Sequence, residues 1–434
     1  MSEVIRIGLL GFGTVGTGVI HVIQNHKQKI SHQLGCEIEI SKILTKNPEV
    51  ENDRADKPVT AVLTNDAYEI VRDPDIQVIV EVMGGVDFTK EVIAEALRNK
   101  KSVVTANKDL LAVHGPELFQ LANTNGCDIY YEASVGGAIP IIRSIKEGLA
   151  SDQITRIMGI VNGTTNYILT KMAQDGASYE SVLKEAQELG YAEANPSSDV
   201  GGLDAARKMA ILASLGFSME VTLDDVEVEG ITHITAEDLQ FSMDLGYEMK
   251  LIGLADRVDG KIEVNVAPTL LPVEHPLANV NGVNNAVYVY SDAIGETMYY
   301  GPGAGSLPTG AAVVADLMNV IRNIRLNIAG KQLISDHLPK QMKTKAETNR
   351  KYFIRLQVED VPGAMKEVVS VFADYHVSME KILQMPLKGT NKVDFVVVTH
   401  HATLQSIEDT LEALKNTKIV SKIESAYRIV GEKK

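Results

Sequence analysis

The N-terminal fold is decided by the stretch Val4-Ile-Arg-Ile-Gly-Leu-Leu-Gly11-Phe12-Gly13-Thr14-Val15-Gly16. Residues 4–10 are an apolar run that predicts a strand, the glycines follow the spacing GxGxxG, and residues 17–28 have helical character. In this arrangement the first glycine permits a tight turn, the second lets a pyrophosphate approach the backbone, and the third lets helix and strand pack closely. The stretch therefore predicts a dinucleotide site at a helix N-terminus. A turn with a purely structural role is the alternative.

The second predicted strand, residues 37–44, ends at Thr45-Lys46-Asn47. Enzymes that use NAD(H) usually carry an acidic side chain at this place, where it binds the ribose 2′-hydroxyl. A neutral or basic end suits a 2′-phosphate better, because a cation can pair with the phosphate. We therefore expect NADP(H) in preference to NAD(H), with Lys46 as the phosphate contact and Arg54 as a second contact.

Two further strands of this series end in glycine-rich or polar turns. Residues 78–82 lead into Met83-Gly84-Gly85, and residues 102–105 lead into Ala106-Asn107-Lys108. Ligands gather at the carboxyl ends of parallel strands, so Gly84, Gly85, Thr105 and Lys108 are expected to line one crevice. Lys108 is either an ordinary basic residue or a functional one. A positive charge at a helix start opposes the helix dipole, which favours the functional role.

Charge and hydropathy exclude several classes of function. The 434 residues include 57 acidic and 42 basic side chains, and the net charge of −15 opposes binding to nucleic acid or to anionic membranes. No apolar run approaches the ~20 residues of a membrane-spanning helix. The N-terminus lacks the basic and apolar regions of a signal peptide, so we expect a cytoplasmic protein.

The two cysteines, Cys36 and Cys127, are too few for a disulfide scaffold or a cysteine-rich zinc site. Both lie next to predicted strands and are interpreted as packing residues. His400 and His401 are adjacent at the end of a predicted strand, where a solvated turn is favoured over a metal site.

The run Gly190-Tyr191-Ala-Glu193-Ala-Asn-Pro-Ser-Ser-Asp-Val-Gly-Gly-Leu-Asp204-Ala-Ala-Arg-Lys208 is an acidic loop followed by a helix. Asp204 and Lys208 are spaced i, i+4, so both head groups lie on one helix face. Such a pair is usually a solvated ion pair of little consequence. Here the surrounding residues are mostly Ala, Leu, Met and Ile, which favours a proton-donating lysine near Asp204 and Glu193.

Two turns have both a structural and a binding interpretation. Residues 128–142 contain a strand that breaks into a glycine pair, and its exposed carbonyls are suited to a hard cation, although a structural turn is favoured on the residues alone. Residues 162–166, Asn-Gly-Thr-Thr-Asn, open a helix and form either an ordinary N-cap or a cradle for a carboxylate.

The order of predicted elements indicates an α/β protein of several domains. We expect an N-terminal Rossmann-type dinucleotide-binding domain, then an α+β catalytic and oligomerisation domain with a mixed sheet, and finally a ferredoxin-like βαββαβ unit. The expected ranges are 1–130, 131–310 and 351–434, with a helix over 311–330 that returns to the first domain and a polar linker over 331–350.

Taken in order, the motifs resemble those of the homoserine dehydrogenase family, and the tail resembles an ACT domain. The motifs are GFGTVG, TANK, YEASVGGAIP, NGTTNYIL and GYAEANPSSDVGGLDAARK. The family pattern often has Asp-Pro-Thr-Ala where this chain has Asn195-Pro196-Ser197-Ser198. The resemblance implies an oxidoreductase that interconverts L-aspartate 4-semialdehyde and L-homoserine with NAD(P)H, in the pathway to threonine, methionine and isoleucine.

The resemblance also implies roles for individual residues. Lys208 corresponds to the proton donor and Lys108 to a second lysine that contacts substrate and cofactor. The substrate ammonium is assigned to Glu193 and Asp204, and further substrate contacts to Gly163, Thr164 and Tyr191. Cofactor contacts fall on Phe12, Thr14, Val15, Lys108, Gly190, Glu193 and Gly305, in addition to the glycine turn itself. A sodium ion is implied at Glu132, Val135, Gly137 and Ile139, largely through backbone carbonyls.

The tail segment Val358-Glu-Asp360-Val-Pro362-Gly363 resembles the ACT loop that binds amino acids at paired interfaces. The resemblance implies feedback by threonine and a homodimer or homotetramer. A purely structural loop is the alternative.

Two other functions fit parts of the sequence. Aspartate-semialdehyde dehydrogenase acts on the same aldehyde but needs a thiolate nucleophile, and neither cysteine lies near the predicted crevice. A non-catalytic amino-acid sensor would keep the dinucleotide fold only as a scaffold. The presence of Lys108, Glu193, Asp204 and Lys208 argues against the sensor.

Overall fold

The computed structural model describes residues 3–331 and 338–431, which form two compact units. Within those residues, unit 1 takes Met1–Gly163, Asp204–Val226 and Val283–Pro339, and unit 2 takes Thr164–Leu203, Glu227–Gly282 and Lys340–Lys434. Of the linker predicted over 331–350, residues 332–337 lie outside the described residues. No helix within the described ranges has both the length and the apolarity that crossing a membrane requires.

Unit 1 contains a six-stranded parallel sheet with the order β3-β2-β1-β4-β5-β6. Its strands are β1 (Val4–Leu10), β2 (Glu37–Leu44), β3 (Val62–Thr64), β4 (Val78–Glu81), β5 (Ser102–Thr105) and β6 (Ile129–Tyr130). β4 and β5 are buried along their whole length, as expected for a parallel sheet covered on both faces. This sheet confirms the predicted Rossmann-type domain.

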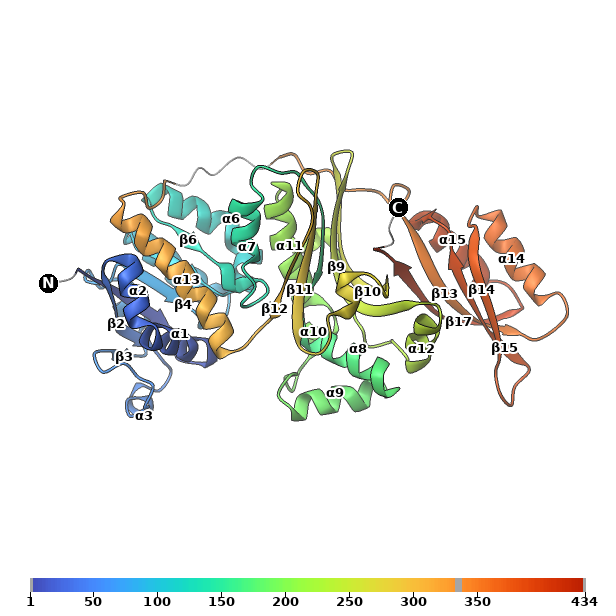
Figure 1. Cartoon of the computed structure of the whole chain (residues 1–434), viewed down its shortest axis with the longest axis horizontal. Helices are drawn as coiled ribbons and strands as arrows, with labels where there is room; N and C mark the ends of the chain where they lie inside the picture. The colour runs from blue at the N-terminus through green and yellow to red at the C-terminus, as the bar shows by residue number, and fades with distance from the viewer. Residues whose placement is uncertain (1–2, 332–337, 432–434) are drawn as a thin grey trace. The chain divides into compact units, whose positions relative to one another are not determined.

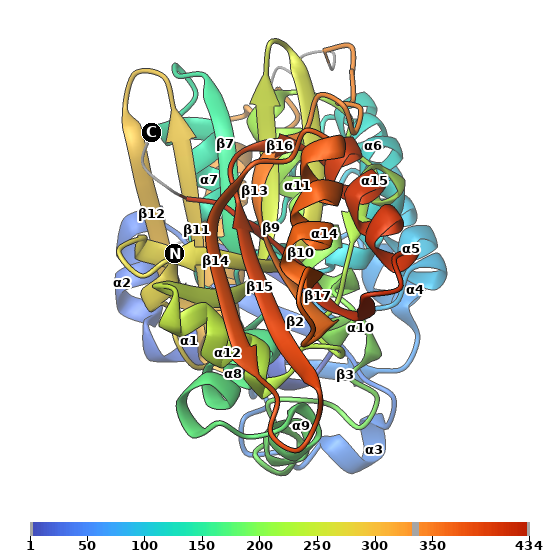
Figure 2. The same ribbon diagram turned by 90° about the vertical axis from the view of Figure 1, so that its right-hand side faces the viewer.

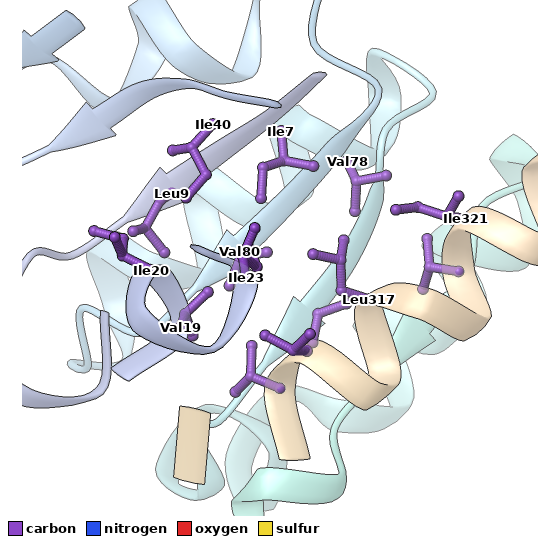
Figure 3. Packing of buried hydrophobic residues seen from close by; sticks show 14 of the residues in the cluster. Ile7, Leu9, Val19, Ile20, Ile23, Ile40, Val78, Val80, Leu317 and Ile321 are labelled. Atoms are coloured by element: carbon purple, nitrogen blue, oxygen red, sulfur yellow. The ribbon is translucent and has the colours of Figure 1, made fainter. Parts of the chain in front are cut away.

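The helices of this sheet are α1 (Thr14–Asn25), α2 (Lys27–Leu34), α3 (Pro48–Glu51), α4 (Ala67–Val71), α5 (Asp87–Arg98), α6 (Lys108–Asn125) and α13 (Ser306–Arg325). Figure 1 shows α1 and α13 side by side against the sheet. Figure 3 shows why: Val19 of α1 and Leu317 of α13 both point into the core formed by strand residues such as Val80. The apolar face of α13 is thus buried within unit 1.

Glycines allow α1 and α13 to approach each other closely. A Cβ atom on Gly18 would lie 1.9 Å from the carbonyl oxygen of Ser306, and one on Gly310 would lie 2.5 Å from the carbonyl carbon of Gly18. Neither position therefore accommodates any larger residue without a shift of the backbone.

The remainder of unit 1 holds a second, antiparallel group of strands. β7 (Ile154–Ile160) pairs with β11 (Asn284–Ser291), which pairs with β12 (Gly295–Pro302). After β6, the chain forms the 3-10 turn η1 (Glu132–Ser134), a short helix α7 (Ile141–Arg143) and a π-helical turn, η2 (Ser144–Gly148). Pro140 has no N–H to donate, and residues before it remain in a glycine turn. α11 (Leu203–Phe217) belongs to this unit from Asp204 onward, followed by η3 (Leu223–Asp225).

Unit 2 is built on a sheet with the order β9-β10-β17-β13-β15-β14. The long hairpin of β9 (Tyr247–Val258) and β10 (Lys261–Pro272) adds to the ferredoxin-like strands β13 (Asn349–Glu359), β14 (Met379–Pro386), β15 (Lys392–Thr399) and β17 (Val420–Ile429). Two short strands, β8 (Val226–Val228) and β16 (Ala402–Thr403), pair with β10 and β13. Figure 2 shows α14 (Ala364–Asp374) and α15 (Leu404–Lys415) side by side, and a common core packs between these helices and the strands. The predicted βαββαβ unit is confirmed.

The other helices of unit 2 are α8 (Gly163–Asp175), α9 (Tyr179–Glu188), α10 (Ser197–Val200), α12 (Ala236–Asp244) and the 3-10 turn η4 (Pro276–Asn279). A buried ion pair anchors α12: Asp238 accepts hydrogen bonds from Arg355 at 2.8 Å, Ser425 at 2.7 Å and Tyr427 at 3.0 Å. One carboxylate thus joins the catalytic part of the unit to two strands of the ferredoxin-like part.

Candidate active site

The polar centre of unit 1 is the carboxylate of Asp204, at the start of α11. Lys208 Nζ donates to Asp204 Oδ2 at 2.7 Å, and Lys108 Nζ lies 3.1 Å from Oδ1. Asn162 donates its side-chain amide to Oδ2 at 2.9 Å. Lys208 also donates to the carbonyl of Val161 at 2.7 Å, at the end of β7. The structure thus brings together the two lysines and the aspartate that the sequence singled out, from α6, β7 and α11.

Burial and charge act in opposite directions on Asp204. The side chain is only 8% exposed, and this burial alone would raise its pKa. The ionic contacts with Lys208 and Lys108 and the hydrogen bonds from Lys208 and Asn162 outweigh burial, so the pKa of Asp204 lies well below its usual value. The carboxylate is therefore charged at any physiological pH, and it is not a solvated surface pair.

The glycine turn lies between β1 and α1 and has room for a ligand. Gly11 has a φ of +115°, and a Cβ there would lie 2.8 Å from the carbonyl oxygen of Val82. A Cβ on Gly16 would lie 2.1 Å from the carbonyl oxygen of Gly11. No described atom lies within 4 Å of a Cβ built on Gly13. The turn therefore fits a dinucleotide, because the second glycine leaves open the space through which a pyrophosphate approaches the helix.

Glu81 organises the next turn, and the sequence analysis did not identify it. This fully buried carboxylate ends β4 and accepts hydrogen bonds from the amides of Met83 and Gly84 and from the Thr105 hydroxyl at 2.6 Å. Burial raises the pKa of Glu81, opposed by these donors. An acidic residue at the end of a fully apolar strand was the signal that would have identified it.

The contact that orders the TANK turn is made by Asn107. Its side chain donates to the carbonyl of Gly85 at 2.7 Å and also caps α6 by accepting from the amide of Leu110 at 3.0 Å. Lys108 follows as the first residue of α6. The strand-end residues Gly84, Gly85, Thr105 and Lys108 thus belong to one hydrogen-bonded region, and Glu81 and Asn107 hold its shape.

Arg54 lies against the glycine turn. Its guanidinium stacks 3.6 Å from the centre of the Phe12 ring and donates to the carbonyl of Phe12 at 2.9 Å and to the Thr17 hydroxyl at 2.8 Å. It is also paired with Asp56 at 2.6 Å. Lys46 is exposed and follows β2 at the same edge of the sheet. Ser306, the residue after Gly305, donates its hydroxyl to the carbonyl of Thr14 at 2.8 Å, and this hydrogen bond places Gly305 near Thr14.

The other residues assigned to substrate belong to unit 2. Tyr191 and Glu193 are exposed on the loop after α9, where Gly190 has a φ of +76°. Thr164 donates its hydroxyl to the carbonyl of Tyr191 at 2.6 Å, which joins the start of α8 to this loop. Gly163, in contrast, is the last residue of the first segment of unit 1, and a Cβ there would lie 2.6 Å from the carbonyl oxygen of Val283.

The turn proposed for a cation is held by its own hydrogen bonds. The Glu132 carboxylate accepts from the amides of Ile142 at 2.7 Å and Arg143 at 2.9 Å, so this side chain anchors α7. Burial raises the pKa of neighbouring Asp316 to about 7. Gly136 and Gly137 have positive φ angles, and a Cβ on Gly137 would lie 2.4 Å from the carbonyl oxygen of Gly303. Any cation here would contact main-chain oxygens, since the carboxylate is already used.

Neither cysteine has the environment of a nucleophile. Cys36 and Cys127 are both buried, and burial raises the pKa of Cys127 to about 11 and also raises that of Cys36. Among the residues that the structure describes, no cluster of three or more His, Cys, Asp or Glu side chains is arranged to hold a metal.

A dinucleotide-type parallel sheet, with Lys108 following its strand β5 and sharing the Asp204 carboxylate with Lys208 of α11, is typical of a nicotinamide-dependent oxidoreductase. Family models agree: the homoserine dehydrogenase NAD-binding domain matches residues 11–132, the homoserine dehydrogenase domain matches residues 140–318, and the ACT domain matches residues 352–416. The chain belongs to the homoserine dehydrogenase family.

Relatives over the full length support the family. The chain is 54% identical to the homoserine dehydrogenase of Bacillus subtilis over 430 residues, covering 99% of each, and 39% identical to that of Pseudomonas aeruginosa, covering 96% of each. A crystal structure of homoserine dehydrogenase from Thiobacillus denitrificans has a TM-score of 0.93 at 35% identity, with 99% of each chain covered. A hyperthermophilic archaeal homoserine dehydrogenase in complex with NADPH has a TM-score of 0.63 at 29% identity, covering 73% of this chain and 98% of that one.

Replacing Asp204 by Asn should lower the free energy of unfolding at neutral pH by about 3 kcal/mol, because two ammonium groups would lose their buried counter-ion. The folded-state pKa of Asp204 is depressed. Its contribution is therefore fully present above the unfolded value of about 3.9 and is lost as the pH falls below it. Denaturant titrations should show a wild-type advantage that is constant above about pH 5 and shrinks below about pH 4.

The matched control for this experiment is Asp175→Asn, which breaks the exposed Lys171–Asp175 pair on α8. Its effect should be much smaller, because water screens this exposed pair. A wild-type advantage over Asp204→Asn that persisted undiminished at about pH 2 would contradict the depressed pKa.

Proposed function

We propose that, in the homoserine dehydrogenase reaction of this chain, Lys208 donates the proton to the developing alkoxide and Lys108 assists it. The observation that supports this assignment is the Asp204 carboxylate, which holds both ammonium groups at 2.7 and 3.1 Å in a buried place. A positioned acid of this kind typically contributes ~10²–10⁴-fold to the rate. Lys208 is the better-fixed of the two, because it also donates to the carbonyl of Val161 and its side chain is only 12% exposed.

The substrate is a zwitterion, so the chain must supply acceptors for its ammonium and donors for its carboxylate. We assign the ammonium to Glu193 and Asp204. Gly163, Thr164 and Tyr191 are assigned to the rest of the substrate, since α8 begins at Gly163 and a helix start presents free amides. These roles come from the motifs, and the hydrogen bond from Thr164 to Tyr191 supports a common position for the last two.

A bound nicotinamide supplies the hydride. The residues assigned to hold this cofactor are Gly11, Phe12, Gly13, Thr14, Val15, Gly16, Lys46, Gly84, Lys108, Gly190, Glu193 and Gly305. NADP(H) is proposed over NAD(H), because Thr45-Lys46-Asn47 provides no acid at the end of β2 and Arg54 lies on the Phe12 ring beside the glycine turn.

Lys208→Met should reduce kcat for the reduction of L-aspartate 4-semialdehyde by ~10²–10⁴-fold, because the alkoxide loses its proton donor. NADPH binding, measured by fluorescence titration, should not change. The control is Lys184→Met, which removes an exposed lysine that also faces an acid one turn away, Glu188 at 3.9 Å. If Lys208→Met kept full activity, proton donation would be assigned to Lys108 instead.

Arg54→Ala should raise KM for NADPH about tenfold or more and change KM for NADH by less than about twofold, because only NADPH carries the phosphate that a guanidinium would bind. Arg72→Ala is the control, since Arg72 is 60% exposed and pairs with Glu95. Equal increases in both KM values would instead indicate that Arg54 maintains the shape of the glycine turn.

A sodium ion is proposed at the main-chain carbonyls of Glu132, Val135, Gly137 and Ile139. Support comes from the chemistry of the turn, because hard cations favour oxygen ligands and consecutive left-handed glycines direct successive carbonyls to one side.

Replacing NaCl by choline chloride at constant ionic strength should lower activity or the unfolding midpoint. Equal activity and an equal unfolding midpoint in the two salts would contradict the proposed sodium site.

The ACT domain is proposed to bind an amino-acid effector, threonine by analogy, at the loop between β13 and α14. In this loop Asp360 donates its amide to the carbonyl of Asn391 at 2.9 Å, and Gly363 caps α14 with a φ of +96°.

A homodimer or homotetramer is proposed on the family resemblance, and sedimentation equilibrium would distinguish these from a monomer.

A further inference from the structure

The carboxylate of Glu81 lies in the middle of the carboxyl edge of the parallel sheet. Glu81 is the last residue of β4, and the strand register places it between Leu10 of β1 and Thr105 of β5. Leu10 directly precedes the glycine turn, and Thr105 begins the TANK turn. The strand order reverses between β1 and β4. Doubly wound sheets bind a dinucleotide across such a reversal, so Glu81 belongs to the strand ends on which the proposed cofactor site is built.

Glu81 is buried without a cationic partner. The residue is fully buried, and its oxygens accept hydrogen bonds from the amides of Met83 at 2.9 Å and Gly84 at 3.1 Å and from the Thr105 hydroxyl at 2.6 Å. Three donors on two oxygens are the pattern of an ionised carboxylate, since a protonated one would need an acceptor of its own. Within the part of the chain that the structure describes, no Lys, Arg or His side chain forms an ion pair with it. Neutral donors stabilise the carboxylate but leave its net charge in place, so its field extends to the space beyond the strand ends.

The turn that Glu81 holds is ordered and open on its outer side. Gly84 and Gly85 have φ angles of +75° and +78°. The Thr89 hydroxyl donates to the carbonyl of Gly84 at 2.6 Å, which fixes the turn from the side of α5. No described atom lies within 4 Å of a Cβ built on Gly84. A ligand can therefore approach the backbone directly next to the buried charge.

The order of the strand ends indicates which half of the cofactor lies near Glu81. Lys46, the proposed 2′-phosphate contact, follows β2, and the glycine turn follows β1. Lys108, which we assign to proton transfer, follows β5. The adenosine and pyrophosphate thus belong to β2 and β1, and the reacting nicotinamide belongs to β4 and β5. Its ring is neutral when reduced and positive when oxidised, so a fixed negative charge at β4 acts differently on the two states.

We propose that Glu81 is a positioning residue with an electrostatic role: its buried charge favours oxidised over reduced nicotinamide and thereby assists departure of the hydride. The inference rests on the proposed nicotinamide site and goes beyond it. The same carboxylate fixes the turn after β4 through Met83 and Gly84, and through the Thr105 hydroxyl it fixes the TANK turn that leads into Lys108. A charge held in this way needs no reorganisation when the ring becomes positive, which is the condition under which fixed charges are most effective.

The test is the ratio of the Kd values of NADP+ and NADPH, measured with the full chain and without substrate. NADPH is titrated by its fluorescence, and NADP+ is titrated by competition with NADPH. Glu81→Gln should raise the Kd of NADP+ about five- to tenfold relative to that of NADPH, because the charge is removed while the size of the side chain is kept. The glutamine oxygen can still accept from Met83 and Gly84, and the Thr105 hydroxyl can turn to accept from the glutamine nitrogen.

Two further variants separate charge from shape. Glu81→Asp keeps the charge but shortens the side chain, so it should weaken both forms by similar factors and leave the Kd ratio within about twofold of wild type. This variant tests the role of the charge even if Glu81→Gln fails to fold. Glu69→Gln is the matched control: Glu69 also accepts from a strand-end threonine, Thr64 at 2.7 Å, but Thr64 ends β3, the edge strand beyond β2. It should leave the ratio unchanged.

Two results would overturn the inference. The first is a Kd ratio that Glu81→Gln leaves at the wild-type value, even if both Kd values rise together, because Glu81 would then act only on the shape of the turns. The second is a ratio that Glu81→Asp lowers or raises as much as Glu81→Gln does, because the effect would then not come from the charge. In both cases wild type still binds NADPH and reduces the aldehyde, so the dehydrogenase assignment stands. A wild-type chain that bound neither form would contradict the proposed cofactor site, and this inference with it.

Discussion

The candidate active site depends on one buried carboxylate. Asp204 is 5% exposed, and an isolated charge in such a place would be too costly to keep. It stays charged because two lysines and an amide converge on it, and each comes from a different element. α6, the end of β7 and the start of α11 are therefore held in one arrangement, and the same arrangement fixes the two ammonium groups to which we assign proton donation.

The parallel sheet positions this centre through close packing that only glycine allows. Gly18 and Gly310 let α1 and α13 approach each other, and Gly11 and Gly16 let the first turn fit between β1 and β4. These contacts bring the carboxyl ends of β1, β4 and β5 to one edge, where Glu81 fixes the turn that precedes the TANK motif. The glycine turn suited to a dinucleotide is thus shaped by backbone contacts, and Arg54 packs against it through the Phe12 ring.

Unit 2 uses buried charge differently. Asp238 pairs with Arg355 in an almost fully buried place, and this pair is completed by hydroxyls of Ser425 and Tyr427. Arg428, in contrast, is surrounded by neutral acceptors. Lys250 on β9 is also fully buried, hydrogen-bonded to Asn281 at 2.8 Å, and burial lowers its pKa to about 8.

The sequence by itself determined the elements whose signals are local. The glycine spacing after β1, the boundaries of β2, and the i, i+4 pair of Asp204 and Lys208 depend on residues a few positions apart, so pattern and propensity suffice. Tertiary structure decided what depends on distant residues. β9 is buried along nearly its whole length and has no alternation to identify it, so it was missed. Lys108 and Asp204 are 96 positions apart, and Glu81 meets the Thr105 hydroxyl because β4 and β5 are neighbours in the sheet. Contacts of this kind exist only after the chain has folded, because they are set by strand order and helix packing rather than by spacing along the sequence.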